Sequence, residues 1–195
     1  ATYFAPDNPT PVYTSVYNIS MLRLTYDFAT RQYVDGKRIG FTDGSNGITQ
    51  DDVDNAGFFS PYEMSPNNSS VLVLGTHRLL KTRNRGDNWT PISGSAGAPI
   101  AQVAIAEGSD NVIWLATKTA RIFKTEDGGG SWTNITNNLP DAPANTIQVH
   151  PNQPNTLFLG TDVGVFMSEN GGQTWQPSSA NFPTVPVVAI VLNTR

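Results

Sequence analysis

The apolar positions of this chain fall in short runs that turn-forming residues interrupt. The runs at residues 71–74, 112–115 and 187–190 are rich in β-branched and aromatic side chains, and Asn, Pro, Gly or Ser flanks them. No stretch repeats apolar residues with the 3.6-residue period of a helix, and 17 Gly and 14 Pro are spread over the 195 residues. Short apolar runs with this punctuation are typical of strands joined by tight turns. The pattern therefore predicts an all-β protein.

A short motif of Ser or Thr, Asp or Asn, Gly and Trp occurs three times, and its Trp residues are 43 positions apart. Its shared positions are Thr82, Asn84, Gly86 and Trp89, then Thr125, Asp127, Gly129 and Trp132, then Ser168, Asn170, Gly172 and Trp175. A matched strand and turn precede each copy, in residues 64–76, 105–117 and 149–161. This spacing identifies internal repeats of one structural unit.

The motif has the chemistry of a tight turn between two strands. Gly supplies a positive φ without steric cost, and the Asp or Asn side chain accepts hydrogen bonds from amides of the turn. The Ser or Thr hydroxyl does the same, and Trp buries a large apolar face beside the turn. We expect a structural role for these residues rather than metal binding.

The motif resembles the Asp-box, or BNR repeat, of sialidases, xyloglucanases and sortilin-like receptors. The resemblance implies a β-propeller of four-stranded blades around a central channel, with the boxes away from the ligand-binding face. It covers repeats at about 58–98, 99–142 and 143–184, and a degenerate repeat at about 1–57, where Tyr33 stands near the place of the box Trp. A further inner strand is expected within 185–192.

The repeat register predicts individual strands. The expected inner strands are Phe59–Met64, Ile100–Ile105, Ala144–Val149 and Val187–Leu192, with Thr2–Ala5 in the first repeat. The expected second strands are Val71–Gly75, Val112–Ala116 and Thr156–Gly160, and the expected third strands are Leu79–Thr82, Arg121–Thr125 and Val165–Ser168. About four blades is near the low end for a propeller, so we expect part of a larger propeller, with self-assembly through unpaired blade edges as a possibility.

Candidate binding residues lie in the connections between second and third strands. His77 and Arg78 follow one second strand, and Lys118 and Asp162 occupy comparable places in the next two repeats. Loops of this kind bind ligands in many propellers, although exposed charge is also ordinary for a loop. We expect them to share one face with the long insertion at residues 35–57.

The insertion is rich in Asp and is expected to be a solvated acidic loop. Its carboxylates Asp43, Asp51, Asp52 and Asp54 are further binding candidates. Asp52, Asp54 and Glu63 partly match the spacing of a calcium loop, but Ala56 occupies a ligand position and no flanking helix is expected. Calcium is therefore a weak alternative, and no cofactor is predicted.

Charge and composition exclude some partners. The net charge of −4 offers no basic surface for nucleic acid, and no apolar run is long enough to cross a membrane. The resemblance implies an extracellular or bacterial cell-surface location. It favours a non-catalytic module that recognises glycan or protein through its top-face loops.

The alternative is part of a sialidase-like or xyloglucanase-like glycoside hydrolase. The resemblance to sialidases would require an Arg triad and a Tyr–Glu pair, yet two of the four Glu residues lie inside boxes. Catalytic carboxylates would then come from Asp43, Asp51, Asp52, Asp54 or Asp162, together with residues outside this chain. A non-catalytic scaffold of the same fold is a third possibility.

Overall fold

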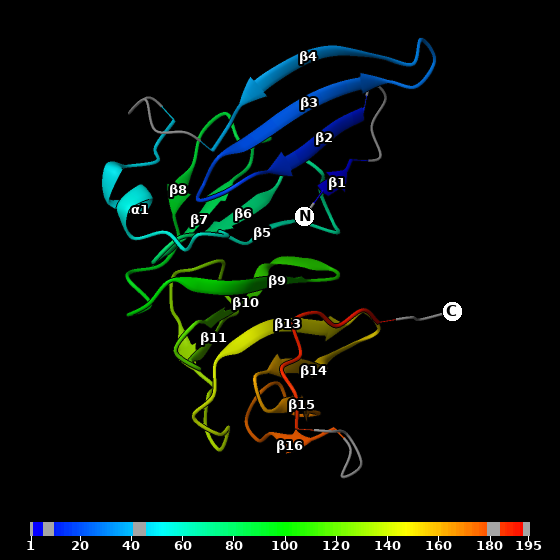
Figure 1. The fold of residues 1–195 in the computed structure, drawn as a ribbon. Coiled ribbons are helices and arrows are strands. Elements are labelled where there is room, and N and C mark those ends of the chain that lie inside the picture. The colour runs from blue at the N-terminus through cyan, green and yellow to red at the C-terminus, as the bar shows by residue number, and fades with distance from the viewer. Residues whose placement is uncertain (1, 6–9, 41–45, 179–183, 193–195) are drawn as a thin grey trace.

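The structure, a computed structural model, describes residues 2–5, 10–40, 46–178 and 184–192. It contains four antiparallel four-stranded sheets, and each sheet is built from strands that follow one another in the chain. The sheets lie one after another in chain order, as Figure 1 shows. The all-β prediction and the four-stranded blades of a β-propeller are confirmed.

The strands of the first two blades have the following bounds. The first blade contains β1 (Thr2–Phe4), β2 (Thr10–Ser15), β3 (Met21–Asp27) and β4 (Gln32–Arg38). The second contains β5 (Tyr62–Met64), β6 (Leu72–Gly75), β7 (Leu79–Thr82) and β8 (Thr90–Pro91). The connection between the two blades includes a short helix, α1 (Gln50–Asp54), in a segment where the sequence predicts a loop.

The other two blades repeat the same meander. The third contains β9 (Ile100–Ala106), β10 (Ser109–Thr117), β11 (Ile122–Thr125) and β12 (Thr133–Asn134). The fourth contains β13 (Ala144–His150), β14 (Gln153–Thr161), β15 (Gly164–Ser168) and β16 (Gln176–Pro177). The predicted first, second and third strands of these blades all fall on observed strands.

The box turns make the hydrogen bonds that their residue types allow. In the third blade, the Thr125 hydroxyl accepts from the Gly129 amide at 2.9 Å, and the Asp127 carboxylate accepts from the Ser131 amide at 2.9 Å. The same two bonds recur in the second and fourth blades. All three box glycines have positive φ, and a Cβ on Gly172 would lie 2.4 Å from Ile135 Cδ1. Glycine is therefore required both by the backbone and by close packing against the preceding blade.

Each box Trp fastens its blade to the preceding one. The indole N–H of Trp89 donates to the Ile39 carbonyl at 2.7 Å, and Trp175 donates to the Ile135 carbonyl at 2.9 Å. Trp132 donates to the Ile92 carbonyl at 2.9 Å. Trp89 and Trp175 are buried, whereas Trp132 is half-buried beside a small cavity of about 90 Å³. The box thus joins blades as well as closing a hairpin.

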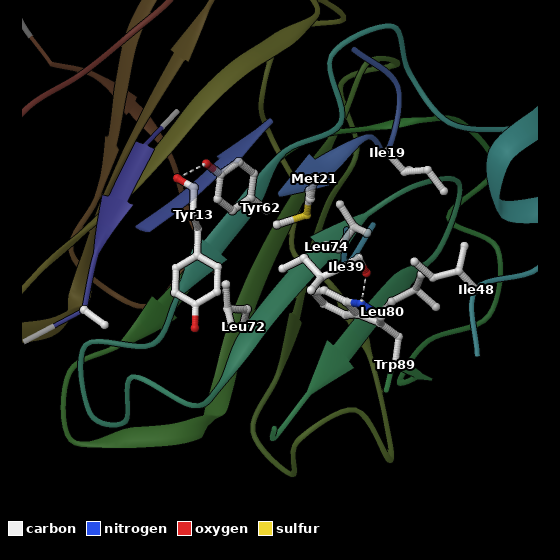
Figure 2. Packing of buried hydrophobic residues seen from close by; sticks show 11 residues of the cluster. Tyr13, Ile19, Met21, Ile39, Ile48, Tyr62, Leu72, Leu74, Leu80 and Trp89 are labelled. Atoms are coloured by element: carbon white, nitrogen blue, oxygen red, sulfur yellow. Dashed lines mark hydrogen bonds between the residues drawn. The ribbon is translucent and has the colours of Figure 1, made fainter. Parts of the chain in front are cut away.

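The first two blades share one apolar core. Figure 2 shows Met21 of β3 and Ile39, which follows β4, packed with Leu74, Leu80 and Trp89 of the second blade. The dashed bonds in the figure are those from Trp89 to Ile39 and from the Tyr62 hydroxyl to the Tyr13 carbonyl, at 3.1 Å. Similar clusters lie between the second and third blades and between the third and fourth. The core is therefore distributed between neighbouring blades.

The predicted inner strand Val187–Leu192 is not a strand in the structure. The Val187 amide donates to the Thr161 carbonyl at 2.9 Å, as the Ile100 amide donates to Thr76 at the start of β9. Beyond this contact no strand of the described chain pairs with the segment, and Val188 and Val191 are 76% and 91% exposed. A strand is stabilised by its ladder, so an unpaired apolar run stays irregular.

Candidate binding face

One side of the blades carries the connections between blades. Because the strands of each sheet alternate in direction, second-to-third strand turns and blade-to-blade connections lie at one end, and the boxes lie at the other. We call the first side the loop face; among the described residues it is formed by 16–20, 39–40, 46–61, 76–78, 92–99, 118–121, 135–143 and 162–163. The predicted residues His77, Arg78, Lys118 and Asp162 all lie on it.

Helix α1 is fixed at its start by a capping box. The Thr49 hydroxyl accepts from the Asp52 amide, and the Asp52 carboxylate accepts from the Thr49 amide at 2.9 Å. These bonds satisfy amides that a helix end would otherwise leave unpaired. The capping box gives residues 49–55 a defined position within the long insertion.

Asp52 is buried and paired with Arg78. Its side chain is 0% exposed, and it accepts from Arg78 Nε at 2.7 Å and from Arg78 Nη2 at 2.9 Å. Burial would raise the pKa of Asp52, but the hydrogen bonds from Arg78 and Thr49 outweigh it and lower the pKa to about 2. The expectation of a solvated acidic loop is wrong for Asp52, because its carboxylate is buried and is hydrogen-bonded by the Arg78 guanidinium instead of by solvent. This bidentate pair ties the insertion to the second blade.

An acidic cleft lies between the insertion and the second blade. Its volume is about 510 Å³, and Asp51, Asp54, Ala56, His77 and Pro99 are among its lining residues. His77 Nε2 lies 3.2 Å from Asp51 Oδ2. The other ring nitrogen, Nδ1, is buried and has no hydrogen-bond partner among the described residues. The cleft therefore presents carboxylate and imidazole groups side by side.

A second cleft of about 510 Å³ adjoins the first at Gly97, which lines both. Arg121, Leu139, Pro140 and Asp141 contribute to its wall. This cleft thus combines one cation and one carboxylate with the apolar surface of Leu139 and Pro140.

Three exposed aromatic side chains form a platform on the loop face. Tyr17, Phe58 and Phe59 are 56%, 64% and 70% exposed. The rings of Tyr17 and Phe58 are nearly parallel, with centroids 6.4 Å apart, and Phe59 meets Phe58 edge-on at 4.8 Å. The Asn18 amide donates to the Phe58 carbonyl at 2.7 Å, which holds the two loops together. We call these three residues the aromatic platform.

The sequence reasoning missed the aromatic platform. It assigned Phe59 to an inner strand, but β5 begins at Tyr62. The adjacent pair Phe58 and Phe59 gave no clear signal, because both faces of a blade pack against neighbours and consecutive strand residues can both be buried, as they are in β6.

Asp162 lies apart from these clefts. It accepts a hydrogen bond from Asn145 at 2.8 Å and does not line either cleft. Asp43 lies outside the described residues. The described part of the chain has no group of three or more His, Cys, Asp or Glu residues arranged to hold a metal ion. The carboxylate of Asp52, proposed for calcium with Asp54 and Glu63, is already engaged by Arg78.

Comparison with known proteins identifies the family. The profile described as "Sortilin, neurotensin receptor 3" (Sortilin-Vps10) matches residues 77–185, more than half of the chain. The chain belongs to the Sortilin-Vps10 family. The match begins at His77, so it includes the last two strands of the second blade, the third and fourth blades, and part of the loop face. A comparison with curated proteins gives no match.

Solved structures similar to this Sortilin-Vps10 chain are β-propellers. An ancestral GH74 enzyme is 18% identical, with a TM-score of 0.67, over 93% of this chain and 24% of its own. The GH74 xyloglucanase from Xanthomonas campestris is 15% identical, with a TM-score of 0.67, over 91% of this chain and 29% of its own. The chain thus spans less than a third of either structure, and at these identities the likeness shows the fold alone. No helix in the described residues has the length and apolarity to cross a bilayer.

Proposed function

We propose that this chain is a non-catalytic module that binds a glycan on its loop face, in an extracellular or cell-surface setting. The aromatic platform is the observation that carries the proposal. Tyr17, Phe58 and Phe59 remain largely exposed although apolar cores lie nearby. Clustered aromatic side chains at the surface of a soluble protein mark a binding site more often than isolated ones do.

Flat aromatic rings suit the flat apolar faces of sugar rings. The C–H groups of a pyranose pack on the negative face of an aromatic ring, and the ring edges leave the hydroxyls free. The near-parallel rings of Tyr17 and Phe58 are both more than half exposed and offer apolar ring surface to a ligand, and their loops are joined through Asn18. A site built on fixed loops loses little conformational entropy when it binds.

Polar groups for orienting a glycan lie next to the platform. Ala56 lines the acidic cleft, and the chain continues from it through Gly57 to Phe58. A sugar on the platform can therefore extend toward the hydroxyl-binding groups of Asp54 and Asn55, which line the same cleft. Apolar contact with a few convergent polar groups is the usual composition of a ligand site.

The test is binding of a panel of neutral and acidic polysaccharides to the wild-type chain and to Phe58→Ala. We expect Phe58→Ala to weaken binding about tenfold, the equivalent of one aromatic contact. Phe28→Ala is the matched control, since Phe28 is 58% exposed and lies in the β3–β4 turn on the opposite side. A chain that binds no polysaccharide, or that binds equally well after Phe58→Ala, would contradict the proposal; a captured peptide would point to a protein ligand.

A glycoside hydrolase is the second candidate, favoured by two carboxylates, Asp51 and Asp54, that line one cleft. Asp51 already interacts with His77 and Asn55, and Asp54 accepts from Gln50 at 2.7 Å. Chromogenic glycosides separate the candidates. Turnover that disappears in Asp54→Asn would support hydrolysis, whereas binding without turnover supports the module.

A further inference from the structure

Two cations on the loop face have no acidic partner. Lys118 and Arg121 are exposed, and neither forms an ion pair with a described residue. By contrast, Lys37, Lys124 and Arg78 each lie within ion-pair distance of a carboxylate. In a chain with a net charge of −4, two unpaired cations in one turn are a distinct local feature.

Lys118 lies beside the aromatic platform. A Cβ placed on Gly57 would be 3.3 Å from Lys118 Nζ, so the ammonium group sits against the backbone immediately before Phe58. Glycine at position 57 leaves room for this approach. A ligand packed on the Phe58 ring is therefore within reach of a positive charge.

Arg121 carries positive charge into the second cleft. It shares that wall with Leu139, Pro140 and Asp141, and no ion pair joins it to Asp141. The acidic cleft, with Asp51 and Asp54, lies on the other side of Gly97. The second cleft thus holds one cation and one carboxylate, whereas the acidic cleft holds two carboxylates, so an anionic ligand meets less repulsion beside Lys118 and Arg121 than in the acidic cleft.

The turn that carries both cations has a defined backbone. The Thr117 hydroxyl accepts from the Arg121 amide at 3.1 Å, and the Lys118 amide donates to the Pro99 carbonyl at 3.0 Å. Ala120 has a φ of 62°, a conformation that a non-glycine residue adopts at a cost. The turn is thus held in one geometry by its neighbours.

We propose that the glycan bound on the loop face carries carboxylates, as a chain of uronic acids does, and that Lys118 and Arg121 bind them. The inference rests on the proposed glycan-binding function. Sugar rings pack on the aromatic platform, while the carboxylate beside the platform accepts from the Lys118 ammonium. A carboxylate farther along the chain pairs with the planar guanidinium of Arg121, which can bind it through two hydrogen bonds.

The test compares acidic polysaccharides with the same polymers after chemical reduction of their carboxyl groups to alcohols. The probes are polygalacturonate, alginate, hyaluronan and glucuronoxylan, titrated into the wild-type chain. We expect at least one acidic polymer to bind, with its reduced form binding about tenfold more weakly, as loss of a charge-assisted hydrogen bond implies. The affinity should also fall as salt is added.

The variants Lys118→Ala and Arg121→Ala should each weaken the binding of the acidic polymer about as much as carboxyl reduction does. Lys118→Arg keeps the positive charge and should retain most of the wild-type affinity. Arg83→Ala is the matched control, because Arg83 is an exposed cation in the box turn on the opposite side. Neutral polymers that bind as well as acidic ones, unaffected by these two substitutions, would overturn the inference and leave glycan binding intact. No binding of any polymer would overturn both.

Discussion

The first blade and the three blades after it share one sheet order but differ in their outer turns. In the second, third and fourth blades, that turn is an Asp-box whose Trp donates to the preceding blade. In the first blade, Phe28 of this turn and Tyr33 of β4 instead lie against Tyr26 of β3, with ring centroids 4.9 and 5.1 Å from that of Tyr26. Phe28 and Tyr33 are mostly exposed.

The difference shows which part of the box is needed to close a hairpin and which part joins blades. The first blade forms β3 and β4 without a box, so the meander itself needs no Trp. The first blade does supply an acceptor, because the Ile39 carbonyl accepts a hydrogen bond from the Trp89 indole. The carbonyls of Ile92 and Ile135 accept in the same way from the next two Trp residues. The box therefore acts mainly across the interface between two blades.

The largest effect that separates the two kinds of blade is expected at Trp175. Trp175→Ala should lower the free energy of unfolding by about 3–5 kcal/mol, because it removes a buried ring and the bond to Ile135. Tyr33→Ala in the first blade should change it by about 0.5 kcal/mol, as an exposed site does. Urea unfolding measures both. Equal losses at the two sites would remove the distinction between boxed and unboxed turns.

The connection from the first blade to the second is expected to depend on Arg78. Arg78→Met should cost about 3 kcal/mol, because it leaves the Asp52 carboxylate buried without its partner. The folded-state pKa of Asp52, about 2, lies below its ordinary 3.8, so the pair stabilises the fold above pH 3.8 and loses this effect as the pH falls to about 2. The deficit of the variant in urea unfolding should shrink over that range. A deficit independent of pH would mean that the ion pair is not its cause.

A smaller effect is expected at the box glycines. Gly172→Ala adds a Cβ at a φ of 92° and 2.4 Å from Ile135, and should cost about 2 kcal/mol. Gly97→Ala is the control for backbone strain alone, since its φ is 79° but no atom lies within 4 Å of the added Cβ. It should cost about 1 kcal/mol. If thermal unfolding shows the same loss for both, close packing against the preceding blade contributes nothing.

The sequence predicts the boxed blades better than the connection between the first two, for a physical reason. The third strand Leu79–Thr82 is predicted with its observed bounds because local turn chemistry and alternation both define it. The burial of Asp52 depends on Arg78, 26 positions away, and no local pattern encodes that pairing. The same limit applies to the aromatic platform, where Tyr17 and Phe58 come from two connections that lie far apart in the sequence.

The smallest effect is expected at Asp127, the one position of the turn where the third box has Asp and the other two boxes have Asn. Asn occupies this position in the other boxes, where Asn84 and Asn170 accept the same turn amide, so Asp127→Asn keeps that bond. In the fourth blade the Asn170 amide donates to the Thr174 hydroxyl at 2.8 Å, and the Asn side chain of Asp127→Asn can donate to Ser131 in the same way.

The pKa of Asp127 is lowered, mainly by the hydrogen bond from the Ser131 amide. The charge of Asp127 therefore stabilises the fold above pH 3.8, and this contribution is lost as the pH falls. We therefore expect a slight decrease in the urea midpoint for Asp127→Asn near neutral pH, and no difference from wild type in acid. A large loss at every pH would show that the carboxylate does more than close the turn.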